Sequence, residues 1–176
     1  MVESSEVLIR DEDVLMLVNQ NRGILWDRIA QFKDQLRQMS GAMEHKVGTP
    51  QSDQMKEVLP LKQTIDGGLY TREIFMPKGT VVVSFIHKKN HPSFFLSGEM
   101  SVLKDTGEIE RIKAPMKIMT EIGTQRVAYM HEDCVWVCVY RTDKETFEEA
   151  EADVYADEYT SLPQTVITQK KALCLE

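Results

Sequence analysis

Apolar residues near the start of the chain recur with the spacing of an α-helix. From position 25 to position 43 they alternate in steps of four and three, which is the a/d pattern of a heptad repeat. The residues of this heptad stripe are Leu25, Ile29, Phe32, Leu36, Met39 and Met43. Upstream, Asp11 or Asp13 can cap a shorter helix, and Gly23 can separate the two helices. The pattern predicts an N-terminal helical segment over residues 1–48.

Two kinds of packing fit the heptad stripe. The helix can pack on its own domain, or it can form a contact between subunits. A stripe of fewer than three heptads is short for an independent coiled coil, so a contact between subunits would need help from the rest of the chain. Both alternatives stay open at this point, and the six stripe residues are the candidate oligomer interface.

The hydrophobic period changes to two from residue 57 onward, after a polar stretch over residues 49–57 that we interpret as a linker. Turn residues such as Asp66-Gly67-Gly68 interrupt the pattern at short intervals. The expected strands span residues 69–76, 80–87, 94–96, 99–103, 109–112, 116–119, 126–130 and 135–140. Short strands joined by glycine-bearing turns are typical of an antiparallel sandwich or barrel, which we expect over residues 57–142.

Helical spacing resumes after the predicted strands, in a segment rich in acidic residues. Phe147 and Val154 lie on its apolar side, and Asp143 can cap the helix. Beyond this helix the chain reads as a loose end with a short strand at residues 165–167. The pattern predicts an acidic helix and a tail over residues 143–176.

The charge of the chain excludes one class of partner. It carries 21 Lys+Arg against 28 Asp+Glu, for a net charge of −7, whereas binding to nucleic acid phosphates needs a basic stripe. No apolar run approaches the ~20 residues of a membrane span. The acidic N-terminus is also unlike a signal peptide.

The cysteines indicate a reducing compartment. The chain has three, and Cys134 and Cys138 lie in one predicted strand, where ~13 Å would separate them, too far for a disulfide. Buried thiols of this kind favour the cytoplasm.

The stretch from Gly79 to Gly98, with His87 and His91 between them, resembles the first motif of the cupin family. That motif has a Gly, two His separated by one residue, a Glu and a Gly. Residues 121–126 resemble the second motif, Pro-x-Gly-x-x-His. The resemblance covers roughly residues 57–142 and is strongest to compact cupin-domain proteins often encoded by bacteriophages. It implies a mainly β, cupin-like jelly-roll barrel, here with an N-terminal amphipathic helix and a C-terminal acidic helix.

The register of the resemblance depends on Gly98, the glycine that ends the first motif. Counting back from it places His91 at the family's Glu and His87 at the second His. Phe85 then stands at the first His position, and Arg126 stands at the third His in the second motif. Of the four family metal positions, this chain keeps one His, has a His in place of the Glu, and loses two.

Two imidazoles four residues apart could bind one Zn²⁺, Mn²⁺ or Fe²⁺, but a third ligand is needed. Glu73 on the neighbouring strand and His131 are the candidates, although His131 lies at a predicted hairpin turn and reads as a solvated loop residue. If His87 points into the barrel, strand alternation places Val81, Val83 and Phe85 on the same face.

Arg126 argues against a cation in this position. A guanidinium does not deprotonate, so it repels a metal ion and suits a carboxylate or a phosphate instead. Its partner could be internal, such as Glu73. Since neighbouring residues of a strand alternate, either Arg72 or Glu73 faces the interior, not both.

Together these observations favour a non-enzymatic assembly protein on a degenerate cupin barrel, such as a phage virion component. It would self-associate through its helices, as a homo-oligomer or with other structural proteins, in the host cytoplasm or the virion. The alternative is a metal-dependent cupin enzyme of dioxygenase or isomerase type, or a small-ligand binder, that uses His87 and His91. A third interpretation is a ligand sensor that holds an anion on Arg126. A divalent metal is the one cofactor that the motif would hold.

Overall fold

The structure is a computed structural model that describes residues 13–104 and 106–173. Three helices come first: α1 (Asp13–Gln20), α2 (Leu25–Arg37) and α3 (Asp53–Val58). The strands that follow are β1 (Leu61–Asp66), β2 (Leu69–Met76), β3 (Val81–Val83), β4 (Ile86–His87), β5 (His91–Ser97), β6 (Glu99–Leu103), β7 (Ile109–Lys113), β8 (Met116–Thr120), β9 (Val127–Met130) and β10 (Cys134–Arg141). The described chain ends with α4 (Phe147–Val154), β11 (Tyr155–Ala156), the short 3-10 helix η1 (Tyr159–Ser161) and α5 (Gln164–Leu173).

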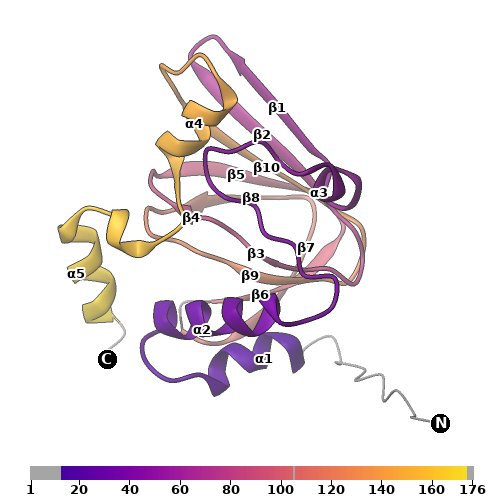
Figure 1. Cartoon of the computed structure of the whole chain (residues 1–176), viewed down its shortest axis with the longest axis vertical. Helices are drawn as coiled ribbons and strands as arrows, with labels where there is room; N and C mark the ends of the chain where they lie inside the picture. The colour runs from indigo at the N-terminus through magenta and orange to yellow at the C-terminus, as the bar shows by residue number, and fades with distance from the viewer. Residues whose placement is uncertain (1–12, 105, 174–176) are drawn as a thin grey trace.

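The strands form two antiparallel sheets that lie one above the other (Figure 1). One sheet has five strands in the order β1-β2-β10-β5-β8, and the other has four in the order β3-β9-β6-β7. The short strands β4 and β11 pair with each other. Many neighbours come from distant parts of the chain, as in a jelly roll. The predicted mainly β fold with helices at both ends is confirmed.

Strand β10 shows how the sequence builds the space between the sheets. Cys134, Trp136, Cys138 and Tyr140 are buried, and the residues between them are half-buried. This alternation has the period of two that strand geometry imposes. Both cysteines are free thiols, and Cys174 lies outside the described residues.

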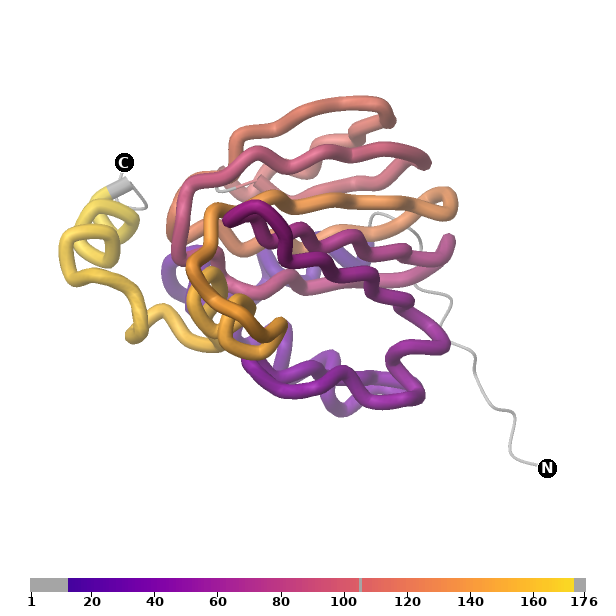
Figure 2. The backbone as a smooth tube through the Cα atoms, turned by 90° about the horizontal axis from the view of Figure 1, so that it is seen from above, coloured from indigo at the N-terminus to yellow at the C-terminus, as the bar shows by residue number. Residues whose placement is uncertain are grey.

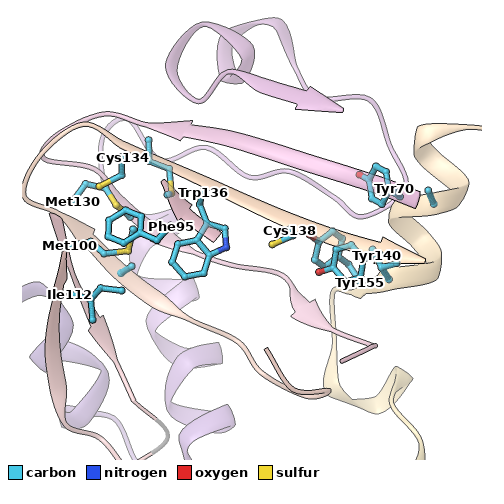
Figure 3. Packing of buried hydrophobic residues seen from close by; sticks show 14 residues of the cluster. Tyr70, Phe95, Met100, Ile112, Met130, Cys134, Trp136, Cys138, Tyr140 and Tyr155 are labelled. Atoms are coloured by element: carbon cyan, nitrogen blue, oxygen red, sulfur yellow. The ribbon is translucent and has the colours of Figure 1, made fainter. Parts of the chain in front are cut away.

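The core between the sheets has two ends of different chemistry (Figure 3). Phe95 and Trp136 meet near the sulfur-containing side chains, with ring centroids 5.6 Å apart. Tyr70, Tyr140 and Tyr155 gather at the other end, beside α4. The tyrosine end therefore places hydroxyl groups inside the fold.

Helices α1 and α2 cover the outer face of the four-stranded sheet (Figure 1). Leu25, Ile29 and Phe32 of the heptad stripe are buried there, and Val81 and Val83 of β3 pack against them. For these three positions the alternative of packing on the chain's own domain holds. A second subunit cannot reach them in this fold.

The second half of the heptad stripe differs from the prediction. Helix α2 ends at Arg37, where the amides of Gln38 and Met39 donate to the carbonyls of Gln35 and Leu36, so Met39 and Met43 lie beyond the helix. Leu36 is partly buried and Met39 is 44% exposed. The chain then turns at Gly41, which has a positive φ of 81°.

The predicted linker is not wholly irregular, because it contains α3. Ser52 caps this short helix by accepting a hydrogen bond from the amide of Met55 at 3.2 Å.

The acidic helix also has another cap than predicted. The side chain of Thr146, not Asp143, accepts from the amide of Glu149 at the start of α4. Asp143 instead pairs with Lys144 at 2.9 Å. The prediction missed that the cap must directly precede the helix.

The predicted strand at residues 165–167 is wrong, since these residues belong to α5. The carbonyl of Pro163 accepts from the amides of Val166 and Ile167, which opens the helix. Both side chains pack near Leu162 in a small apolar cluster, and this burial overrides their strand propensity. Asp11 lies outside the described residues. None of the described helices is long and apolar enough to cross a membrane.

Candidate functional site

A break in one predicted strand positions the first histidine. Val81 and Val83 face the helix layer, but the strand is interrupted at Ser84 and Phe85 before β4 begins. Ser84 there bonds to the backbone of Arg126 through both its amide and its hydroxyl. The prediction that these valines share a face with His87 is wrong, because the interruption resets the alternation.

His87 and His91 lie together between the sheets. Their side chains are almost fully buried, and their rings stack with centroids 4.7 Å apart. The hydroxyl of Tyr140 lies 2.8 Å from Nδ1 of His87. Burial raises the pKa of Tyr140, so this hydroxyl keeps its proton, and the tautomer of His87 decides which of the two groups donates.

His91 begins a chain of hydrogen bonds through the core. Its Nδ1 lies 3.0 Å from the carbonyl of Lys89, and its Nε2 lies 3.1 Å from the hydroxyl of Ser93. Ser93 in turn contacts Thr120 at 2.9 Å, and Arg126 donates to Thr120 at 2.9 Å. Every bond is satisfied when His91 is neutral, with Nδ1–H donating to the carbonyl and Nε2 accepting from Ser93.

The surroundings keep both imidazoles neutral. Burial is the largest cause that lowers the pKa of His87 well below 6.5, and the neighbouring His91 adds to it. The guanidiniums of Arg126 and Arg72 lower it further. Burial likewise lowers the pKa of His91 to about 4, against the hydrogen bond to Lys89, which raises it.

The structure does not bring Glu73 to the histidines. Its carboxylate is 37% exposed and pairs with Lys62 at 3.1 Å, on the outer face of β2. Arg72 is the neighbour that faces the interior. The expected pairing of Glu73 with Arg126 is therefore wrong, and the guanidinium carbon of Arg126 instead lies 5.5 Å from the ring centroid of Trp136.

His131 also lies elsewhere, and it is not a solvated loop residue. It is buried, and its Nε2 lies 2.7 Å from the hydroxyl of Ser101. Ser101 alternates with the core residues Met100 and Val102, so it faces the helix layer. The contact between His131 and Ser101 therefore lies on the helix-covered face of the four-stranded sheet, away from His87 and His91.

Sequence reasoning missed a buried carboxylate next to this site. Glu151 of α4 is 2% exposed, and its Oε1 lies 3.6 Å from Nε of Arg72. The guanidinium of Arg72 also lies 5.5 Å from the ring centroids of Phe85 and Tyr155. The sequence signal that could have revealed this buried carboxylate is the position of Glu151 on the apolar side of an otherwise amphipathic helix.

Glu151 also fixes the segment that leads from the helices to the barrel. Its Oε2 lies 3.1 Å from Nε2 of His45 and accepts from the amide of Gly48 at 3.0 Å. One carboxylate therefore connects α4, strand β2 and this segment across the tyrosine end of the core.

These residues do not fit a divalent metal. Among residues 13–104 and 106–173, no group of three His, Cys, Asp or Glu side chains could hold one. His87 and His91 are two neutral donors without an acidic third ligand, and Arg126 stands where the resemblance places the third His. The arrangement suits a self-contained polar network better than a metal centre.

No protein-family model and no curated protein matches the sequence. Similar solved structures include the Cupin_2 domain of an XRE family transcriptional regulator from Enterobacter cloacae, at 13% identity over 49% of this chain and 99% of that one, with a TM-score of 0.41. Ectoine synthase from P. lautus is similar at 13% identity, over 56% of this chain and 75% of that one, with a TM-score of 0.45. KdgF from Halomonas sp. is similar at 15% identity, over 49% and 82%, with a TM-score of 0.41.

The fold defines the class of protein. The chain is a two-sheet antiparallel jelly roll with a pair of histidines between the sheets. It has the jelly-roll fold that the resemblance of its glycine and histidine motifs implies.

Proposed function

We propose that this protein is a non-catalytic assembly protein, in which a cupin-like barrel serves as the scaffold for self-association. The observation that carries the proposal is the hydrogen-bond chain from His91 through Ser93 and Thr120 to Arg126. It fills the metal region of the fold with groups that already satisfy one another.

The residues of this site disfavour metal-dependent catalysis of the kind that cupin enzymes perform. A metal on His91 would take the Nε2 lone pair that Ser93 now uses, and the guanidiniums of Arg126 and Arg72 would repel the ion. A metal-dependent enzyme of dioxygenase or isomerase type on His87 and His91 is the alternative, and it would need a third ligand from outside the described residues.

Self-association through the helices stays a prediction. With Leu25, Ile29 and Phe32 covered inside the chain, only the end of the heptad stripe around Met39 is open to a partner. The setting in a phage virion also stays a prediction.

The mass of the purified full-length chain in solution tests the proposal. Size-exclusion chromatography with light scattering at tens of micromolar is expected to give one discrete oligomer. A monomer across the whole accessible concentration range would overturn the assembly role.

A further inference from the structure

Strand β1 has an open outer edge. It stands at one end of the five-stranded sheet and pairs only with β2. In Figure 1 it forms the outer margin of that sheet. Among the described residues, no hydrogen bond joins its backbone to any element other than β2. An edge of this kind presents a row of N–H and C=O groups with which another strand can pair.

The hairpin between β1 and β2 determines which backbone groups face the open edge. Both glycines of its two-residue turn have a positive φ, as in a type I′ turn, so Asp66 and Leu69 form a hydrogen-bonded pair. Further along, the amide of Phe75 donates to the carbonyl of Pro60 at 3.0 Å. Because hydrogen-bonded pairs alternate in an antiparallel ladder, the even-numbered residues of β1 bond to β2. The backbone groups that point to the open edge are therefore those of Leu61, Gln63 and Ile65.

The exposed side chains of β1 carry opposite charges at equal distances from its middle. Lys62 and Asp66 lie on the outer face, with Thr64 halfway between them. A charged side chain commonly protects an edge strand from pairing with another chain. Here an antiparallel copy of β1 centred on Thr64 brings each Lys62 opposite an Asp66, so pairing joins opposite charges. The strand therefore complements its own reverse.

Two other edge strands of the described chain, β7 and β8, lack this property. Pairing around a two-fold axis joins residues of the same face and the same edge, so the paired residues are an even number of positions apart. In β8, pairing centred on Ile118 sets Lys117 against Met119 and leaves the charge without a partner. In β7, the central Arg111 would meet its own copy. The pattern of charges thus favours self-pairing at β1.

The ion pair that Lys62 makes within the chain is compatible with this arrangement. Lys62 lies 3.1 Å from Glu73 on β2, but its side chain is 82% exposed and an ammonium group has three N–H donors. No ion pair joins Asp66 to another described residue. Lys62 can therefore lie between two carboxylates, one on β2 and one on a strand added at the edge.

We propose that β1 pairs antiparallel with β1 of a second copy of this chain, around a two-fold axis beside Thr64 and perpendicular to the sheet. Gln63 then exchanges backbone hydrogen bonds with Ile65 of the partner subunit, and the symmetry repeats this pair. On the outer face Lys62 meets the partner's Asp66 at a non-hydrogen-bonded position, where side chains approach most closely. The two five-stranded sheets become one continuous sheet. This inference rests on the proposed assembly function and names the surface that performs it.

Amide hydrogen exchange tests the edge without altering the chain. In the dimer the amides of Gln63 and Ile65 donate to the partner subunit, whereas in the monomer they face solvent. Their exchange is expected to slow by about tenfold or more at a concentration where light scattering shows the oligomer. The amide of Thr64, which bonds to β2 in both states, is the internal control. Equally fast exchange of Gln63 and Ile65 in the oligomer would overturn the proposal.

A charge exchange tests the two-fold register. Lys62→Asp and Asp66→Lys each place like charges opposite each other, and each is expected to raise the dimer dissociation constant several-fold in sedimentation velocity. The double variant restores opposite charges and is expected to recover most of the affinity. Glu73→Gln, in the same row but inside the chain, is the matched control and is expected to leave the constant unchanged. Losses that add up in the double variant would contradict the register.

The outcomes separate this inference from the proposed function. If Met39→Glu, at the exposed end of the heptad stripe, dissociates the oligomer and Lys62→Asp does not, β1 is not the interface, but the assembly role stands. If the unsubstituted chain is a monomer, both fail. Circular dichroism of each variant confirms that loss of mass reflects dissociation, not unfolding.

Discussion

At the scale of single residues, the two ring nitrogens of His91 define what the site can do. One donates to a backbone carbonyl and the other accepts from Ser93, so a proton added to the ring would break the second bond. The motif resemblance could predict that His87 and His91 meet. It could not predict the partners of His91, because Thr120 comes from a strand that only the tertiary fold brings alongside β5.

The neutral state of His91 makes stability depend on pH. Its pKa is about 4 in the fold and about 6.5 when unfolded, so below pH 6.5 the unfolded chain binds a proton that the folded chain does not. Stability is therefore full above pH 6.5 and falls as the pH drops toward 4. At pH 5 the loss from His91 is about 2 kcal/mol, and the lowered pKa of His87 acts in the same direction.

Urea unfolding at pH 7 and pH 5 measures this loss. His91→Asn, which has no proton to take up, is expected to show a smaller difference between the two pH values than the unsubstituted chain. Equal differences in both proteins would contradict the neutral, buried histidine.

Glu151 provides a second test at the residue scale. Glu151→Gln keeps the shape but removes the negative charge beside Arg72, which is expected to cost about 3 kcal/mol because a buried guanidinium loses its counter-ion. Glu149→Gln, on the exposed side of the same helix, is the control and is expected to change stability by less than about 0.5 kcal/mol. Similar losses in both variants, measured by denaturant unfolding, would argue against the role of Glu151.

At the scale of elements, the sequence predicts where the strands lie better than it predicts where each strand ends and which face each side chain occupies. The period of two in β10 is a local property, and the prediction that Cys134 and Cys138 are buried thiols of one strand is confirmed. The break before β4 was not predictable, because it depends on bonds between Ser84 and the distant Arg126. Likewise, burial against Leu162 decides that residues 165–167 are helical.

Gly98, which set the register of the motif, is constrained by the element that passes behind it. Its φ is 93°, and a side chain there would overlap the carbonyl oxygen of Asp133 and lie 2.7 Å from Sγ of Cys134. Gly98→Ala is therefore expected to cost more than about 3 kcal/mol, against about 1 kcal/mol for Gly41→Ala, which has a positive φ but open space. Thermal unfolding of the two variants measures the difference. Equal decreases in melting temperature would contradict the close approach of Gly98 to Asp133 and Cys134.

At the scale of the whole molecule, the outer faces of the two sheets differ in what covers them. Helices α1 and α2 cover the four-stranded sheet, so most of the heptad stripe is used inside the chain. No described helix crosses the five-stranded sheet in the view from above (Figure 2), and Leu96 and Met119 on that sheet are 50% and 61% exposed. Local periodicity predicted an apolar helix face but not what covers it, since that choice depends on which sheet the helix reaches.

The metal content of the purified chain tests the central claim most directly. Elemental analysis after expression with Zn²⁺, Mn²⁺ and Fe²⁺ in the medium is expected to give far less than one ion per chain, unchanged in His87→Ala and His91→Ala. One ion per chain that either substitution abolishes would contradict the account of the histidine pair as a closed polar network.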